Sequence, residues 1–237
     1  MNRNADQFVA GIFEWFIGVI EDINDPEKMN RVKVRCFGFH SQDKSLVTTK
    51  DLPWATVMMP ATSASFKGIG SNHELVVGSW VVGFFRDGPS AQDPLVLGSI
   101  ASKTEGDIDI PTEAQNDPPY NKVHKTEAGH LVEFDNTPGS ERINIQHKSG
   151  TTINIAEDGT VNIQAANNQI NLLSDTFING KLNVTGPSEL NSTLSVAGAQ
   201  TNQSTLVADG EVTAKGINLS SHIHRAQGPT SPTTPPL

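Results

Sequence analysis

The chain has 237 residues and a formal net charge of −9, which is enough sequence for one large domain or two small ones. The acidic balance argues against nonspecific binding to nucleic acid or anionic lipid, because both are negatively charged. No apolar stretch approaches the roughly 20 residues of a membrane span. The first ten residues lack the regions of a signal peptide. We therefore expect a protein that is made in the cytoplasm and that does not cross a bilayer as a helix.

The first hundred residues predict a small β-barrel and contain all three tryptophans. Strands are expected at Phe13 to Glu21, Arg31 to Phe39, Trp54 to Met59, Glu74 to Phe85 and Leu95 to Ile100. Turn signals separate them, among them Asn24-Asp25-Pro26 and Gly68-Ile69-Gly70. Five short strands in this space suit a closed barrel of the OB type. Cys36, the single cysteine, is expected to be a small core residue.

Arg31, Lys33 and Arg35 alternate with apolar residues on the second expected strand, so the three cations share one face. OB barrels often bind nucleic acid through such residues. The net charge of −9 favours instead a solvated face or a contact with another subunit.

Residues 102–121 predict an extended linker that is stiffened by prolines. The segment after it is rich in histidine and glutamate, and His124, His130 and His147 with Glu127 and Glu133 form a candidate metal or acid–base cluster. These residues lack the HExxH order of a zinc protease. We expect them to have structural roles on extended strands.

From Arg142 to Leu219 the sequence repeats short units in which two aliphatic residues flank a polar one. Examples are Ile143-Asn144-Ile145, Ile153-Asn154-Ile155, Val161-Asn162-Ile163, Ile170-Asn171-Leu172 and Leu182-Asn183-Val184. The period is that of a β-strand with one apolar face. Such short strands cannot bury that face alone, so they must stack on copies of themselves or on another chain.

The residues from His124 to Arg142 resemble the neck of the central spike proteins of contractile phage tails, which are related to the valine-glycine-repeat proteins of type VI secretion. The opening from Trp15 to Asp22 is also similar, as are Arg31 to Arg35, Leu52 to Ala55 and Val96 to Gly98. The resemblance implies an all-β protein with an N-terminal OB-fold barrel. It also implies a trimeric intertwined β-helix, a triangular prism, that ends in a tip able to pierce the host envelope.

His222 and His224 are the candidate metal ligands of that tip. Two positions apart on a strand, they would point to the same side, and three chains would offer six imidazoles to one ion. Nitrogen donors suit a late divalent metal, which leaves iron, nickel, cobalt and zinc open. Iron is favoured by the resemblance alone, because short phage spikes with this histidine spacing hold iron in this way. We expect one metal ion per trimer.

The expected organisation is an OB-fold barrel in residues 1–101, a linker in 102–121, a neck in 122–140, a trimeric β-helix in 141–221 and a metal-binding tip with a proline-rich tail in 222–237. The expected function is that of a cell-puncturing spike, a homotrimer at the centre of a virion's tail baseplate. It would be joined to the tail hub by its barrel and would pierce the host outer membrane with its tip.

Two alternatives to the phage spike remain. They are the spike of a type VI secretion-like machine and a fibre that binds host glycans. Some family members carry a lysozyme-like domain between barrel and neck, where this chain has only the linker. We therefore expect no enzymatic activity, no catalytic residues and no nucleic-acid partner.

Overall fold

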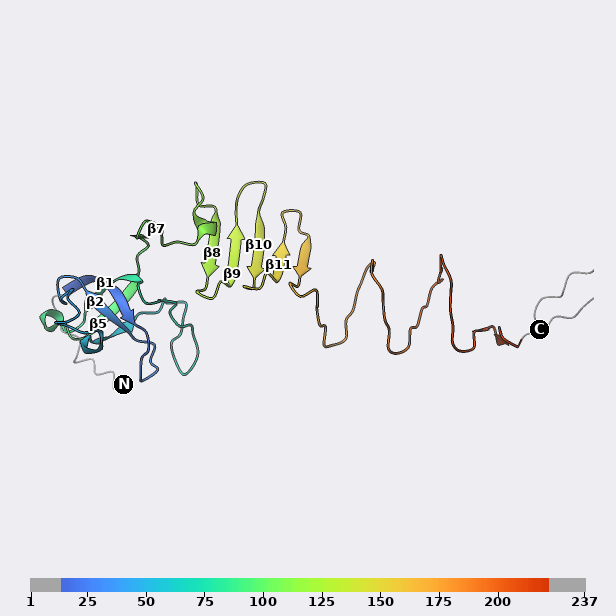
Figure 1. Ribbon diagram of the computed structural model, residues 1–237, viewed down its shortest axis with the longest axis horizontal. Coiled ribbons are helices and arrows are strands. Elements are labelled where there is room, and N and C mark those ends of the chain that lie inside the picture. The colour runs from blue at the N-terminus through green and yellow to red at the C-terminus, as the bar shows by residue number, and fades with distance from the viewer. Residues whose placement is uncertain (1–13, 222–237) are drawn as a thin grey trace, which may run out of the picture. The chain divides into compact units, whose positions relative to one another are not determined.

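A computed structural model describes residues 14–221, and every element in this range is a β-strand or a short 3₁₀ helix. The all-β class predicted from the sequence is confirmed. The chain divides into two units, residues 1–173 and 174–237. The first contains a closed barrel and a separate five-stranded sheet (Figure 1).

The barrel consists of β1 (Glu14–Asp22), β2 (Val32–Cys36), β3 (Trp54–Val57), β4 (Trp80–Phe85) and β5 (Pro94–Ser99), closed in the order β1-β2-β3-β5-β4. β3 and β5 are parallel and the other pairs are antiparallel. The 3₁₀ helices η2 (Thr49–Asp51) and η3 (Gly88–Ser90) lie in its loops. The predicted five-stranded closed barrel is confirmed.

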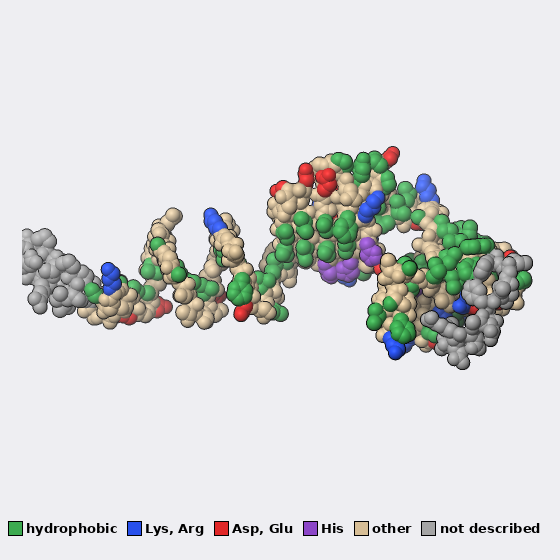
Figure 2. Space-filling model, turned by 180° about the vertical axis from the view of Figure 1, so that it is seen from behind, with side chains coloured by type: hydrophobic (Ala, Val, Ile, Leu, Met, Phe, Trp, Pro, Cys, Tyr) green, Lys and Arg blue, Asp and Glu red, His purple; other side chains and the backbone are tan. Residues whose placement is uncertain are grey.

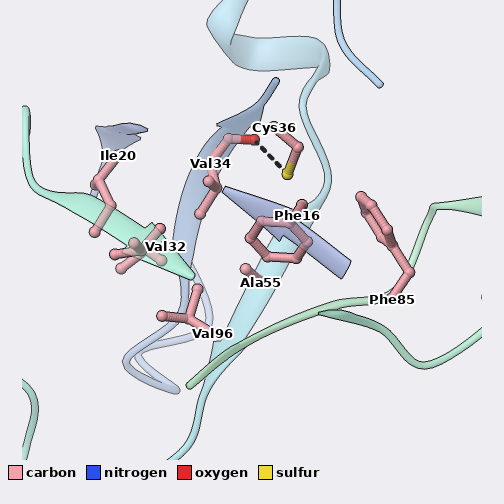
Figure 3. Packing of buried hydrophobic residues seen from close by; sticks show 9 residues of the cluster. Phe16, Ile20, Val32, Val34, Cys36, Ala55, Phe85 and Val96 are labelled. Carbon is pink, nitrogen blue, oxygen red and sulfur yellow. Dashed lines mark hydrogen bonds between the residues drawn. The ribbon is translucent and has the colours of Figure 1, made fainter. Parts of the chain in front are cut away.

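Alternating side chains from these strands fill the barrel interior, as Figure 3 shows. The buried cluster is made of Phe16, Ile20, Val32, Val34, Cys36, Ala55, Val81, Phe85 and Val96. Gly83 takes an interior position on β4 because a Cβ there would lie 2.1 Å from the carbonyl oxygen of Leu95 and 2.6 Å from the Phe16 ring. Cys36 is buried as predicted, and burial raises the pKa of its thiol to about 12.

The largest error in a predicted barrel strand is at the start of β4. The strand expected from Glu74 begins only at Trp80. Gly78 adopts a left-handed backbone with φ of 96°, and Ser79 N–H donates back to the Val76 carbonyl. This turn breaks the alternation that the sequence suggested.

The segment predicted as an extended linker contains a small hairpin of β6 (Lys103–Thr104) and β7 (Asp107–Ile108), followed by η4 (Thr112–Ala114). Glu105 and Gly106 both have positive φ angles at the hairpin turn. This local conformation lets the chain double back where a fully extended linker was expected.

The five-stranded sheet, here called the neck sheet, has the order β12-β11-β10-β9-β8 and is antiparallel throughout. Its strands are β8 (Asn121–Lys125), β9 (Leu131–Asp135), β10 (Arg142–Gln146), β11 (Thr152–Ile155) and β12 (Val161–Gln164). β10, β11 and β12 coincide with the first three aliphatic units that the sequence predicted to be strands.

Residues 165–212 contain no strand in the described chain, and the next strands are the two-residue pair β13 (Thr213–Ala214) and β14 (Ile217–Asn218) (Figure 1). We call residues 165–212 the unpaired segment. The strands predicted around Ile170 to Leu172 and Leu182 to Val184 are not formed within the single chain, and the trimeric β-helix to which they were assigned stays a prediction. A strand requires a hydrogen-bonding neighbour, and none of the described strands pairs with this segment.

Candidate functional site

One face of the neck sheet is apolar and uncovered. Register brings Phe134, Ile143, Ile155 and Val161 into one row, and Val132, Ile145, Ile153 and Ile163 into the next. We call these eight residues the apolar face. Apart from Val132, all are between 38% and 59% exposed. Figure 2 shows them as parallel rows across the sheet.

The opposite face of the sheet is polar. Asn144, Asn154 and Asn162 lie opposite one another across β10, β11 and β12. Such a one-sided distribution is typical of a sheet with one solvated face and one buried face. Within the single chain, however, the aliphatic side of these strands is not buried.

The unpaired segment has the same character. Its large apolar side chains are all at least 37% exposed, and they are Ile170, Leu172, Leu173, Phe177, Ile178, Leu182, Val184, Leu190, Leu194, Val196, Leu206, Val207 and Val212. Soluble monomers rarely expose contiguous apolar surface of this extent. The apolar face and the unpaired segment are therefore candidate association surfaces.

The polar face holds a buried carboxylate near β8. Glu133 is 3% exposed, and its carboxylate accepts hydrogen bonds from Asn121 Nδ2 at 3.0 Å, Arg142 Nε at 3.1 Å and Asn144 Nδ2 at 3.2 Å. Arg142 also lies 3.4 Å from Asp135. The hydrogen bonds that Asp135 accepts from Thr137 lower the pKa of its carboxyl. These partners tie β8, β9 and β10 together, which is the structural role expected for Glu133.

The three histidines of the predicted cluster lie at one end of the apolar face. His124 is opposite Val132 in the register of β8 and β9, and the rings of His130 and His147 lie 4.5 Å apart. Glu127 is exposed in the β8–β9 turn, and His124 Nε2 lies 3.1 Å from Glu74. Among residues 14–221, no three His, Cys, Asp or Glu side chains are placed to hold one metal ion together.

The interpretation of the β2 cations as a solvated or subunit-contacting face is wrong. Lys33 and Arg35 are 6% and 3% exposed, because the loop between β2 and β3 covers them. Lys33 Nζ donates to the Lys50 carbonyl, and Arg35 donates to the carbonyls of Ser41 and Val47. Lys33 and Arg35 therefore do not form an exposed basic face.

The two arginines of this face, Arg31 and Arg35, each form an ion pair with a carboxylate. Arg35 donates to both oxygens of Glu21, at 2.8 and 3.0 Å, and this lowers the pKa of the Glu21 carboxyl to about 2. Arg31 donates to both oxygens of Asp25, which holds the pKa of that carboxyl well below its ordinary value. Sequence alone could not show this, because the acids are contributed by the preceding strand and turn.

The predicted metal ligands His222 and His224 lie outside the described residues, which end at Ser221. β13 and β14 form a hairpin just before them, with Lys215 and Gly216 at positive φ in the turn. Glu211 accepts hydrogen bonds from the backbone and hydroxyl of Ser220 at its base.

The described residues include no helix long and apolar enough to span a bilayer. The closed barrel, with one parallel and four antiparallel pairings, places the chain in the class of OB-fold proteins. The family model described as the Gp5 N-terminal OB domain matches residues 38–184. The chain belongs to this family.

Two relatives support the assignment. Protein Gp5 of Vibrio phage KVP40 is 27% identical over 237 aligned positions, which cover 62% of this chain and 56% of the relative. The pre-baseplate central spike protein Gp5 of Enterobacteria phage T4 is 38% identical over 87 positions, which cover 34% of this chain and 15% of that protein. The chain thus spans about half the length of the first relative and a smaller part of the second. The predicted resemblance to phage baseplate spike proteins is confirmed.

Proposed function

We propose that this protein is the central spike of a contractile phage tail, a component of the virion in which three chains share one prism. The observation that carries this proposal is the uncovered apolar surface of the neck sheet and the unpaired segment. Its membership in the Gp5 family and its relative named as a central spike protein support the same reading.

Threefold association would bury this surface. Each Ile, Leu or Val that becomes fully buried contributes about 1.5–3 kcal/mol. Backbone groups of the unpaired segment would find partners on neighbouring chains, which closes open strand edges. The regular aliphatic units would form the interior of a narrow, stiff shaft.

Stiffness is the proposed mechanism. Contraction of the tail sheath supplies the work, and the shaft transmits it to a small area of host outer membrane. In this proposal the barrel docks to the tail hub. Trp15 and Ile17 are 59% and 46% exposed on the outer side of β1 and supply apolar surface for that contact. Trp15 packs edge-on against Phe84 at 5.7 Å, which holds its ring in place.

We also propose that His222 and His224 from three chains bind one metal ion, iron in the first instance, and clamp the tip. The hairpin of β13 and β14 is the last described element before the two histidines in the sequence. Elemental analysis of the purified protein tests this. Iron at one ion per three chains, lost in His222→Ala with His224→Ala, is the expected result, and a wild type without stoichiometric iron would contradict it.

Catalysis forms no part of the proposal. The buried acids of the neck, Glu133 and Asp135, are engaged by Arg142, Asn121 and Thr137. Incubation with peptidoglycan and with capsular polysaccharide is expected to release no product. Glycan-specific binding would favour the alternative of a host-binding fibre, and assembly onto a secretion tube would favour the secretion spike.

Sedimentation of the wild type tests the central part of the proposal. A mass three times that of one chain, stable on dilution, is expected. A monomer at micromolar concentration would contradict the shared prism.

A further inference from the structure

Two histidines face each other at the end of the neck sheet, far along the chain from the proposed tip ligands. Leu131 and Gln146 are the last register pair of β9 and β10, and His130 and His147 are the next residues outward. Their rings lie 4.5 Å apart at an interplanar angle of 48°. They belong to the chain reversals β8–β9 and β10–β11, which lie at the same end of the sheet.

Both backbones are held by short hydrogen bonds, so the pair is positioned before any ligand arrives. His130 N–H donates to Thr126 Oγ1 at 3.1 Å, and its carbonyl accepts from Thr126 N–H at 2.9 Å. His147 N–H donates to the Thr151 carbonyl at 2.8 Å. Preorganised donors lose little conformational entropy when they bind.

The rings line an open cavity of about 220 Å³, together with apolar side chains such as Val132 and Ile145. Figure 2 shows histidine side chains gathered at the edge of the apolar rows. The cavity leaves space beside the imidazoles for an ion with its water ligands, and its lining also includes the polar residues His124, Thr126 and Gln146.

The contacts of His147 Nδ1 with Ser149 leave Nε2 as the ring nitrogen for metal binding. His147 Nδ1 lies 2.8 Å from Ser149 Oγ. With the proton on Nδ1, that hydroxyl accepts a hydrogen bond and Nε2 is free to bind an ion, which is the usual second contact of a metal-bound histidine. Ser149 N–H, at 3.2 Å from the same nitrogen, would give up its longer contact.

We propose that His130 and His147 form a cross-strand chelate for a divalent transition-metal ion. Two nitrogen ligands of one ion lie roughly 3 Å apart, since each bond is about 2.0–2.1 Å long. Facing rings with centroids 4.5 Å apart reach this spacing with small side-chain rotations. Imidazole donors select copper, nickel or zinc over calcium or magnesium, and copper should bind most tightly.

The site takes both ligands from one chain and neither from the proposed tip. Within residues 14–221 no third His, Cys, Asp or Glu joins the pair, and water would complete the coordination. The ion would hold the β8–β9 and β10–β11 turns together at one end of the neck sheet, next to the apolar face.

Calorimetric titration with nickel chloride tests the proposal in the full chain carrying His222→Ala and His224→Ala, which removes the tip histidines. We expect one ion per chain. His130→Gln or His147→Gln should weaken binding at least tenfold. The matched control His124→Gln, on the adjacent strand at the same end, should change it less than twofold. Copper loaded at one equivalent should show two nitrogen ligands by electron paramagnetic resonance.

Absence of saturable nickel binding in the tip-deficient protein would overturn the chelate. Equal losses in all three glutamine variants, or a loss confined to His124→Gln, would overturn the assignment of the ligands. Circular dichroism of each variant separates loss of binding from loss of fold. Failure of the spike proposal would appear in the sedimenting mass and would leave this titration unchanged.

Discussion

The barrel and the aliphatic region after it use the same residue types in opposite ways. In the barrel, nine side chains from all five strands meet in a closed interior. In the neck sheet and the unpaired segment, Ile, Leu and Val lie on the surface of the chain. A closed barrel supplies every strand with two neighbours, whereas a row of short units supplies an interior only when chains associate. The local residue pattern therefore predicts the alternation of a strand, but it does not predict whether the apolar side chains of that strand are buried.

Charging the apolar face should produce the largest effect. Ile145→Asp with Ile153→Asp places two carboxylates opposite each other in the second row. Each unpaired buried charge costs several kcal/mol, so the dissociation constant should rise on the order of a thousandfold or more. Light scattering on a sizing column measures the change.

Asn154→Asp with Gln164→Asp is the matched control, since it adds the same charge to the polar face. It should leave the assembly intact. Equal dissociation by both double variants would show that the two faces do not differ in burial.

A cavity in the barrel should destabilise only the barrel. Phe85 is fully buried against Phe16 and Phe39, so Phe85→Ala should cost about 3–5 kcal/mol of unfolding free energy. All three tryptophans lie in the barrel, so their fluorescence in a denaturant titration reports this unit. The oligomeric mass should remain that of the wild type.

Leu46 is 74% exposed and serves as the comparison. Leu46→Ala should change stability by less than about 0.5 kcal/mol. A Phe85→Ala protein that dissociates while its barrel stays folded would contradict the independence of the two regions.

Removing the charge of Glu21 should be the next largest effect. Glu21→Gln leaves Arg35 buried without its carboxylate partner, at a cost of about 3 kcal/mol. The same tryptophan-monitored titration measures it. Glu14→Gln, at the start of β1, removes an equal charge without breaking an ion pair that holds the β2–β3 loop, and it should have little effect.

Acid should weaken the barrel through the same pair. The pKa of Glu21 is about 2 in the folded chain, below its ordinary value of 4.5. Its contribution is therefore fully present above about pH 4.5 and is lost as the pH falls toward 2. Thermal melting between these limits should show a smaller pH dependence in Glu21→Gln. An unchanged slope would mean that other carboxylates dominate acid unfolding.

The sequence predicted strand positions and side-chain burial correctly where both depend on the residue's own strand. The alternation of Ile143-Asn144-Ile145 predicted β10, and Cys36 was placed in the core. Sequence failed where burial depends on a distant segment. The alternation of Lys33 and Arg35 with apolar residues predicted an exposed face, because no local sequence feature predicts that the β2–β3 loop covers β2. The His130–His147 contact likewise requires the register of β9 and β10, which spacing alone does not give.

The unpaired segment shows that a strand-like pattern does not by itself produce a strand. Ile170-Asn171-Leu172 has the same pattern as the unit that forms β10, yet it carries no strand in one chain. The neck strands are joined by tight turns and pair with one another, while later units lack a neighbour within the chain. In the proposed prism, neighbouring chains would supply their pairing partners.

Hydrogen–deuterium exchange of residues 165–212 tests this claim most directly. Residues 170–211 of the described chain make no backbone hydrogen bonds with one another. If neighbouring chains supply the partners, these amides should exchange as slowly as those of β4 in the wild type. Exchange at the rate of an unstructured peptide, beside a protected barrel, would contradict the shared interior.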